Sequence, residues 1–128
     1  MPKSYLLLFA ALGVASCSHE GVPIIAMEMD SLVVALQAHQ AEFGALPSGT
    51  DSAICKALAG ENARKLKFIE MRPSGIAADG RFLDLWGTPY RFYFSDGGIM
   101  VRSAGPNRQF DDQKTKHSDD YFRSDTKT

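Results

Sequence analysis

A short aromatic run followed by a glycine turn constrains this chain more than any other feature. The run is Pro89 to Phe94, the turn is Asp96-Gly97-Gly98, and a second apolar run covers Ile99 to Arg102. Aromatic residues favour strands, and glycines supply the positive φ angles that tight hairpin turns need. We therefore predict an antiparallel hairpin that buries one face on a helix and turns the other to water.

Alternation along this hairpin predicts which side chains face the core. We expect the buried set to be Tyr90, Phe92, Phe94, Ile99 and Val101. The pair Trp86-Gly87 just before the hairpin predicts a tight corner with the indole beneath it, because glycine permits a close approach of the backbone.

A long polar loop follows the hairpin and contains two pairs of aspartates, Asp111-Asp112 and Asp119-Asp120. Ser103 to Asn107 has the composition of a turn, and so few apolar residues follow that a core cannot hold the loop. Clustered carboxylates and turn carbonyls suit Ca²⁺, which takes about six to eight oxygen ligands. The alternative is a solvated acidic loop whose charge is offset by the basic residues around it.

Two motifs in this region resemble those of the major pseudopilin of type II secretion. Asp84-Leu-Trp-Gly-Thr-Pro-Tyr90 is similar to the family's D-P-W-G-N-P-Y, and Ser103-Ala-Gly-Pro-Asn107 with Asp119-Asp120-Tyr121 is similar to its S-x-G-P-D-G…D-D-I. Both occur in the family's order with a hairpin between them. The resemblance implies an α+β, pilin-like fold, in which a long N-terminal helix packs on a small antiparallel sheet and an irregular C-terminal loop binds calcium.

Carried over position by position, the resemblance also implies the calcium ligands. They are the Ala104 carbonyl, Asn107, Asp119 and Asp120, and the longer loop of this chain adds Asp111 and Asp112. Asn107 is neutral where the family has a carboxylate, and Leu85 replaces the family's proline. The expected cofactor is therefore calcium, held by a ligand set that differs from the family's.

Residues 1–16 predict a bacterial lipoprotein signal peptide, with Lys3 before an apolar run from Leu6 to Val14 that is too short to span a membrane as a mature helix. Val14-Ala-Ser-Cys17 resembles a lipobox, which implies lipidation of Cys17. Ser18 stands where an aspartate would mark inner-membrane retention, so we expect a lipid-anchored protein of the cell envelope, on the outer rather than the inner membrane. Ordinary cleavage near Cys17, or a disulfide from Cys17 to Cys55, remain the alternatives.

Pro23 starts the main predicted helix, which runs to about Phe43 and is closed by Gly44. Apolar residues recur along it at helical spacing, while polar residues lie mostly elsewhere on the wheel. Glu28 and Asp30 would be costly inside a membrane. We therefore expect this helix to pack on the sheet, as part of a soluble pilin-like domain tethered by lipid.

The remaining elements are shorter. A second helix is predicted from Ser52 to Ala59 with Ile54, Cys55 and Leu58 turned inward, and short strands are predicted at Phe68 to Met71 and Gly80 to Leu83. The predicted organisation is a signal peptide at 1–16, a tether at 17–22, a pseudopilin-like domain at 23–123 and a flexible tail at 124–128.

Catalytic signatures such as G-x-S-x-G, H-E-x-x-H and C-x-x-C are absent from the sequence. We expect His39 to be solvated and His117 to be at most a minor metal ligand. The net charge of −1 and the lack of a basic, aromatic-studded run argue against nucleic acid. We predict a non-enzymatic protein without a small-molecule substrate, whose partners are other envelope or secretion-system proteins and the membrane.

Two functions stay open. The first is a structural or assembly component related to type II secretion. The second is a lipid-anchored binding module that uses a pilin-like head for an unrelated partner.

Overall fold

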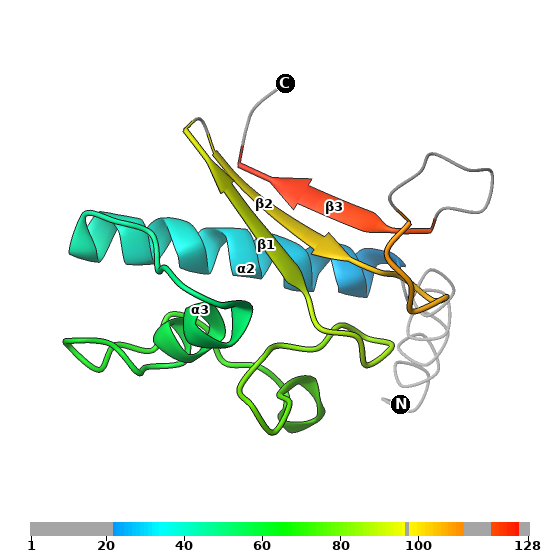
Figure 1. The fold of residues 1–128 in the computed structure, drawn as a ribbon, viewed down its shortest axis with the longest axis horizontal. Coiled ribbons are helices and arrows are strands. Elements are labelled where there is room, and N and C mark those ends of the chain that lie inside the picture. The colour runs from blue at the N-terminus through cyan, green and yellow to red at the C-terminus, as the bar shows by residue number, and fades with distance from the viewer. Residues whose placement is uncertain (1–21, 97, 112–118, 126–128) are drawn as a thin grey trace, which may run out of the picture.

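The computed structural model describes residues 22–96, 98–111 and 119–125 (Figure 1). Its elements in chain order are α2 (Val22–Phe43), α3 (Asp51–Leu58), the 3-10 helix η2 (Pro73–Gly75), β1 (Arg91–Ser95), β2 (Gly98–Ser103) and β3 (Tyr121–Ser124). The strands form an antiparallel sheet in the order β1-β2-β3, and α2 lies across one face of it. The predicted α+β class is confirmed. Cys17, Asp112 and His117 lie outside the described residues.

Helix α2 begins and ends where the sequence predicts. Its second residue is Pro23, a position where the missing N–H costs no helical hydrogen bond. Gly44 ends it in the left-handed conformation, with φ at +76° and its N–H donating to the Gln40 carbonyl at 2.8 Å. The side chains that α2 buries are Ile25, Met29, Leu32, Val33, Ala35 and Leu36. No helix among the described residues is long and apolar enough to cross a membrane.

The predicted hairpin forms with the predicted core face. Phe92 pairs with Val101 and Phe94 with Ile99, so these side chains share the face that α2 covers. Ile99 and Val101 are buried, as is Tyr90 just before β1, while the two phenylalanines are half-buried at its edge. Period-two alternation therefore fixed the orientation of the sheet correctly.

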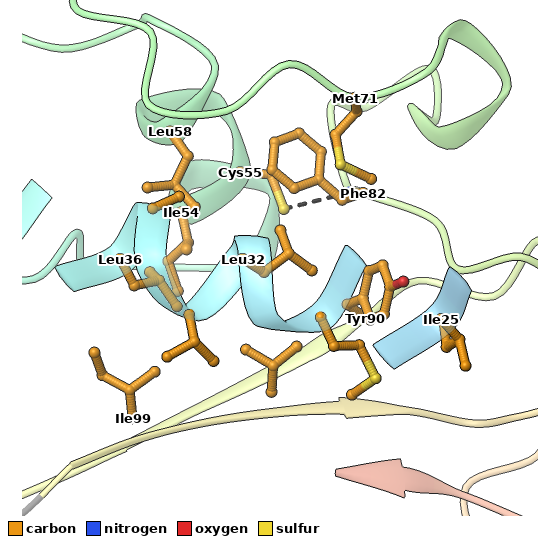
Figure 2. Packing of buried hydrophobic residues seen from close by; sticks show 14 residues of the cluster. Ile25, Leu32, Leu36, Ile54, Cys55, Leu58, Met71, Phe82, Tyr90 and Ile99 are labelled. Atoms are coloured by element: carbon orange, nitrogen blue, oxygen red, sulfur yellow. Dashed lines mark hydrogen bonds between the residues drawn. The ribbon is translucent and has the colours of Figure 1, made fainter. Parts of the chain in front are cut away.

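Helix α3 closes the core from the other side of α2, and Figure 2 shows its inward side chains. Thr50 caps the helix, because its hydroxyl accepts a hydrogen bond from the Ala53 N–H at 3.2 Å. Ile54, Cys55 and Leu58 are buried as predicted. The Cys55 sulfur accepts a hydrogen bond from the Phe82 N–H at 3.3 Å, and burial raises the pKa of this thiol to about 12.

Both short strands predicted before the hairpin are wrong. Phe68 to Met71 is extended but attaches to the end of α3, where the Phe68 N–H donates to the Leu58 carbonyl at 2.9 Å. Gly80 to Leu83 forms only isolated bridges, one from Phe82 to Ile76 and one from Leu83 to Pro89. The apolar pattern of these segments indicated partial burial, which is correct. A partly buried irregular segment has the same apolar pattern as a strand, so the pattern alone could not distinguish them.

Strand β3 and the surroundings of His39 also differ from the sequence-based expectation. β3 ends at Ser124, which therefore belongs to the sheet rather than to a tail, and the following Asp125 is bonded to the sheet, because it accepts a hydrogen bond from the Ile99 N–H at 2.8 Å. His39 is 8% exposed rather than solvated. Its ring contacts Phe43 and Phe68, at centroid distances of 4.7 and 5.5 Å, and its Nδ1 is 2.8 Å from a backbone carbonyl oxygen.

Candidate functional site

The acidic loop after β2 brings three of the predicted metal ligands together. Asp111, Asp119 and Asp120 each offer one carboxylate oxygen, and these atoms lie within 4.8 Å of one another. The sheet brings these residues together. Ser103 at the end of β2 pairs with Tyr121 at the start of β3, so Asp119 and Asp120, which directly precede Tyr121, lie beside the segment that follows Ser103. Three carboxylates at this spacing repel one another unless a cation or donors compensate them.

Asp119 is the member of this cluster whose bonding is incomplete. Its Oδ2 accepts a hydrogen bond from the Asn107 N–H at 3.1 Å, but its Oδ1 is buried with no hydrogen-bond partner among the described residues. Gly105 makes room for this side chain. A Cβ at Gly105 would lie 2.2 Å from the Asp119 carbonyl oxygen and 3.0 Å from Oδ1. A buried carboxylate oxygen without a partner is destabilising, and a bound cation would remove that penalty.

Asp120 is held differently. Its side chain is fully buried, accepts a hydrogen bond from the Arg102 Nε at 2.6 Å and forms an ion pair with the Arg102 Nη2 at 2.5 Å. The Asp111 N–H also donates to this carboxylate, at 3.1 Å to Oδ2. Asp120 therefore ties the loop to β2 and has its charge balanced already, so Asp111 and Asp119 are the carboxylates with capacity to spare.

The two predicted ligands that are not aspartates take different places. Ala104 is fully buried next to Gly105 at the edge of the cluster. Asn107 acts as an organiser: its Nδ2 donates to Asp111 at 2.9 Å, and its amide oxygen accepts from the Gln109 N–H at 2.9 Å. The donor set that the structure assembles is thus all oxygen, which suits a hard cation rather than a soft one.

A second polar cluster, which the sequence did not reveal, joins α2 to the corner before β1. The Tyr90 hydroxyl donates to Glu28 at 2.5 Å, and Arg72 forms an ion pair with the same carboxylate. Arg72 also donates to the backbone carbonyls of Leu83 and Asp84, at 3.1 and 2.8 Å. Burial raises the pKa of Tyr90, and the bond to Glu28 raises it further, so the phenol stays protonated and acts as a fixed donor.

Asp84 holds together the tight turn before β1, which is formed by the motif Asp84 to Tyr90. The side chain is 1% exposed, and its Oδ1 accepts hydrogen bonds from the N–H groups of Trp86 and Thr88, at 3.0 and 2.9 Å. Gly87 supplies the positive φ of +88° that this tight turn requires. The turn presents Trp86 to Tyr121, and their rings stack with centroids 5.8 Å apart. A short-range aspartate turn of this kind is readable from sequence.

Comparison with known proteins returns no match to any family model, curated protein or solved structure. The functional assignment therefore depends on the motifs and on the geometry of these two clusters.

Proposed function

We propose that this chain is a non-enzymatic, pseudopilin-like envelope protein, a structural or assembly component related to type II secretion that is held at a membrane by lipid on Cys17. The observation that carries the proposal is a contact between the two motifs on which the resemblance is based. The Ser103 hydroxyl, which begins the second motif, donates to the Asp84 carboxylate, which begins the first, at 2.7 Å. Both residues are buried, so the motifs form one unit.

The arrangement of helix and sheet supports the same proposal. Helix α2 lies across the sheet, as the pilin-like resemblance implies (Figure 1), and Asp111, Asp119 and Asp120 lie together before the start of β3. Two acidic side chains near the N-terminus of α2 form contacts with the sheet region. Glu28 contacts Tyr90, and Asp30 forms an ion pair with Arg123 at 3.1 Å. A tether by lipid rather than by an apolar helix is consistent with this use of the helix.

Calcium is the proposed ligand of the acidic cluster. Asp111 and Asp119 would hold the ion, with Asp120 beside them as a weaker ligand because Arg102 balances its charge, and Ala104 and Asp112 are the further candidates from the loop. The fit is supported by the buried Asp119 Oδ1, which lacks a partner among the described residues. The ion would supply the positive charge that keeps the loop closed without a core beneath it.

A calcium titration of the thermal midpoint tests the metal. We expect calcium to raise the midpoint of the full chain, by an amount that corresponds to about 2.7 kcal/mol at a hundredfold excess over Kd. Asp119→Asn should abolish the response, and Asp96→Asn, which changes an exposed turn residue, should keep it. An unchanged midpoint, or an equal response of both variants, would remove calcium from the proposal.

Two measurements test the anchor and the role. The intact mass of the membrane-extracted protein should equal a diacylated or triacylated chain that starts at Cys17. Crosslinking in the native envelope should capture secretion-system subunits. Consistent capture of one unrelated envelope protein would instead favour the second candidate, a lipid-anchored binding module. The observation in favour of that candidate is the exposure of Tyr93 and Phe122, at 38% and 46%, on the sheet face turned away from α2.

A further inference from the structure

The sheet face turned away from α2 carries aromatic, sulfur and guanidinium groups. Strand alternation places these outward residues on it: Arg91, Tyr93, Met100, Arg102, Phe122 and Ser124. None of them is acidic. A sheet face that meets only water normally alternates polar side chains of both charges, so this composition needs a different explanation.

Guanidinium groups and aromatic rings alternate across this outer face. Arg91 pairs with Arg102, and Arg102 with Phe122, so the three side chains form one row across the strands. Phe110, from the loop after β2, lies over the row. The Arg91 Cζ is 3.8 Å from the centre of its ring, and the Arg102 Cζ is 5.2 Å from the centres of both Phe110 and Phe122. These contacts hold the guanidinium groups in place.

The two arginines have different capacities for a ligand. Arg102 is 7% exposed and binds Asp120. Arg91 is exposed, and no carboxylate of the described residues lies within ion-pair distance of it. Asp51, at the start of α3, is close enough to interact with Arg91 electrostatically, but it is half-buried and forms no ion pair with Arg91 among the described residues. The Arg91 guanidinium is therefore an oriented donor that no carboxylate in the described part of the chain pairs with.

A shallow hollow lies beside this row. It has a volume of about 270 Å³ and a mostly apolar lining at the turn end of the hairpin, made by Tyr93, Phe94, Ser95, Gly98, Ile99, Met100 and Ser124. A dry cavity of about 150 Å³ accommodates a benzene ring, so this hollow is large enough for one apolar or aromatic side chain. Arginine, tyrosine, phenylalanine and methionine are the residues enriched at the centres of protein interfaces.

We propose that the outer face of the β1-β2-β3 sheet binds a segment of a partner protein in which a carboxylate is close to an apolar or aromatic side chain. The carboxylate binds Arg91, and the apolar side chain enters the hollow that Tyr93 and Met100 help to line. Charge complementarity selects this occupant, because Arg91 is exposed and has no ion-pair partner among the described residues, whereas the charge of Arg102 is already balanced by Asp120. The inference goes beyond the proposed function and depends on neither the calcium nor the lipid.

The test uses the full chain labelled with ¹³C at its methionine methyl groups, in calcium-containing buffer. The probe is a synthetic peptide, acetyl-Glu-Phe-Glu-Leu-Glu-amide, and its counterpart has glutamine in place of every glutamate. We expect the acidic peptide to shift the Met100 methyl signal and the glutamine peptide to bind at least about tenfold more weakly, as loss of a charge-assisted hydrogen bond implies. Arg91→Gln should produce a similar loss, and Phe122→Ser a smaller one.

Arg64→Gln is the matched control, because Arg64 is also exposed but lies in the loop after α3 and pairs with Glu42. It should bind the acidic peptide like the unchanged protein. Equal binding of both peptides, no effect of Arg91→Gln, or no binding of either peptide would overturn the proposal. Binding of phosphatidylglycerol vesicles that depends on Arg91, without peptide binding, would also overturn it and identify a lipid surface. None of these results alters the calcium titration or the envelope crosslinking, so the two proposals can fail separately.

Discussion

The hydroxyl of Tyr90 donates a 2.5 Å hydrogen bond to Glu28, a residue 62 positions earlier in the chain. This bond joins the first turns of α2 to the residue just before β1. Arg72, just before η2, binds the same carboxylate. Three distant segments therefore meet at one partly buried carboxylate. A buried polar cluster of this kind fixes one arrangement of a helix on a sheet, which apolar contacts alone specify less sharply.

Replacing Tyr90 by phenylalanine tests the contribution of this bond. The ring remains to fill the core, but Glu28 loses one donor, so we expect the free energy of unfolding to fall by about 1–3 kcal/mol. Urea denaturation followed by circular dichroism measures it. Tyr93→Phe is the control, because Tyr93 is exposed on the other face of the sheet. Equal stability losses in both variants would show that the Glu28 bond contributes nothing particular.

The raised pKa values of two buried groups predict a loss of stability in alkali. Cys55 has an ordinary pKa of 9.0 and a folded value of about 12, so the unfolded chain releases this proton first. Stability is therefore complete below pH 9 and decreases as the pH rises to about 12, by up to about 1.4 kcal/mol per pH unit for one proton. Tyr90, whose pKa is also raised by burial, adds to the loss above about pH 10.

Cys55→Ala separates these two contributions. The variant should be less stable at neutral pH because it leaves a cavity, but its stability should change less between pH 9 and pH 10, where the cysteine is the first of the two to titrate. Urea denaturation at a series of pH values measures both slopes. Identical slopes for the variant and the unchanged chain would mean that the thiol ionises normally in the fold.

Patterns within short stretches of the sequence predicted the helices and the hairpin, whose formation depends on residues close together in the chain. The α2 helix, the hairpin and the inward side of α3 follow from apolar periodicity, a helix-closing glycine and a glycine turn. The missed features are long-range. β3 is four residues of mixed polarity, Tyr121–Ser124, whose strand conformation depends on pairing with β2. Likewise, helical periodicity assigns Glu28 to the solvent-facing side of α2, whereas the fold brings Tyr90 and Arg72 into contact with it.

The candidate metal site shows the same division. Adjacent aspartates in a long polar loop predicted a cluster, and three of them do converge. The sequence could not show that Arg102 balances Asp120. This ion pair depends on the path of the backbone, which is set by the pairing of β3 with β2.

Asp84→Asn should cost more stability than an ordinary surface change. The carboxylate accepts hydrogen bonds from two backbone N–H groups and from Ser103, and an amide would place an NH₂ group against at least one of these donors. We expect a loss of about 2–4 kcal/mol in the free energy of unfolding. Asp96→Asn, in the exposed hairpin turn, should change it by less than about 0.5 kcal/mol. A similar small effect at both positions would show that the corner tolerates a neutral side chain.

Gly105→Ala, compared with Gly44→Ala, isolates the packing of the acidic loop. Both glycines have φ at +76°, so an alanine at either position carries the same conformational penalty of about 1–2 kcal/mol. The positions differ in their surroundings, because a Cβ at Gly44 meets nothing within 4 Å, whereas a Cβ at Gly105 would be 2.2 Å from the Asp119 carbonyl oxygen.

The loop must therefore move in Gly105→Ala. We expect the unfolding free energy of this variant to fall by at least about 2 kcal/mol more than that of Gly44→Ala, together with a weaker thermal response to calcium. Equal losses in urea denaturation, with the calcium response intact in both variants, would mean that Asp119 does not need to lie against the backbone at Gly105.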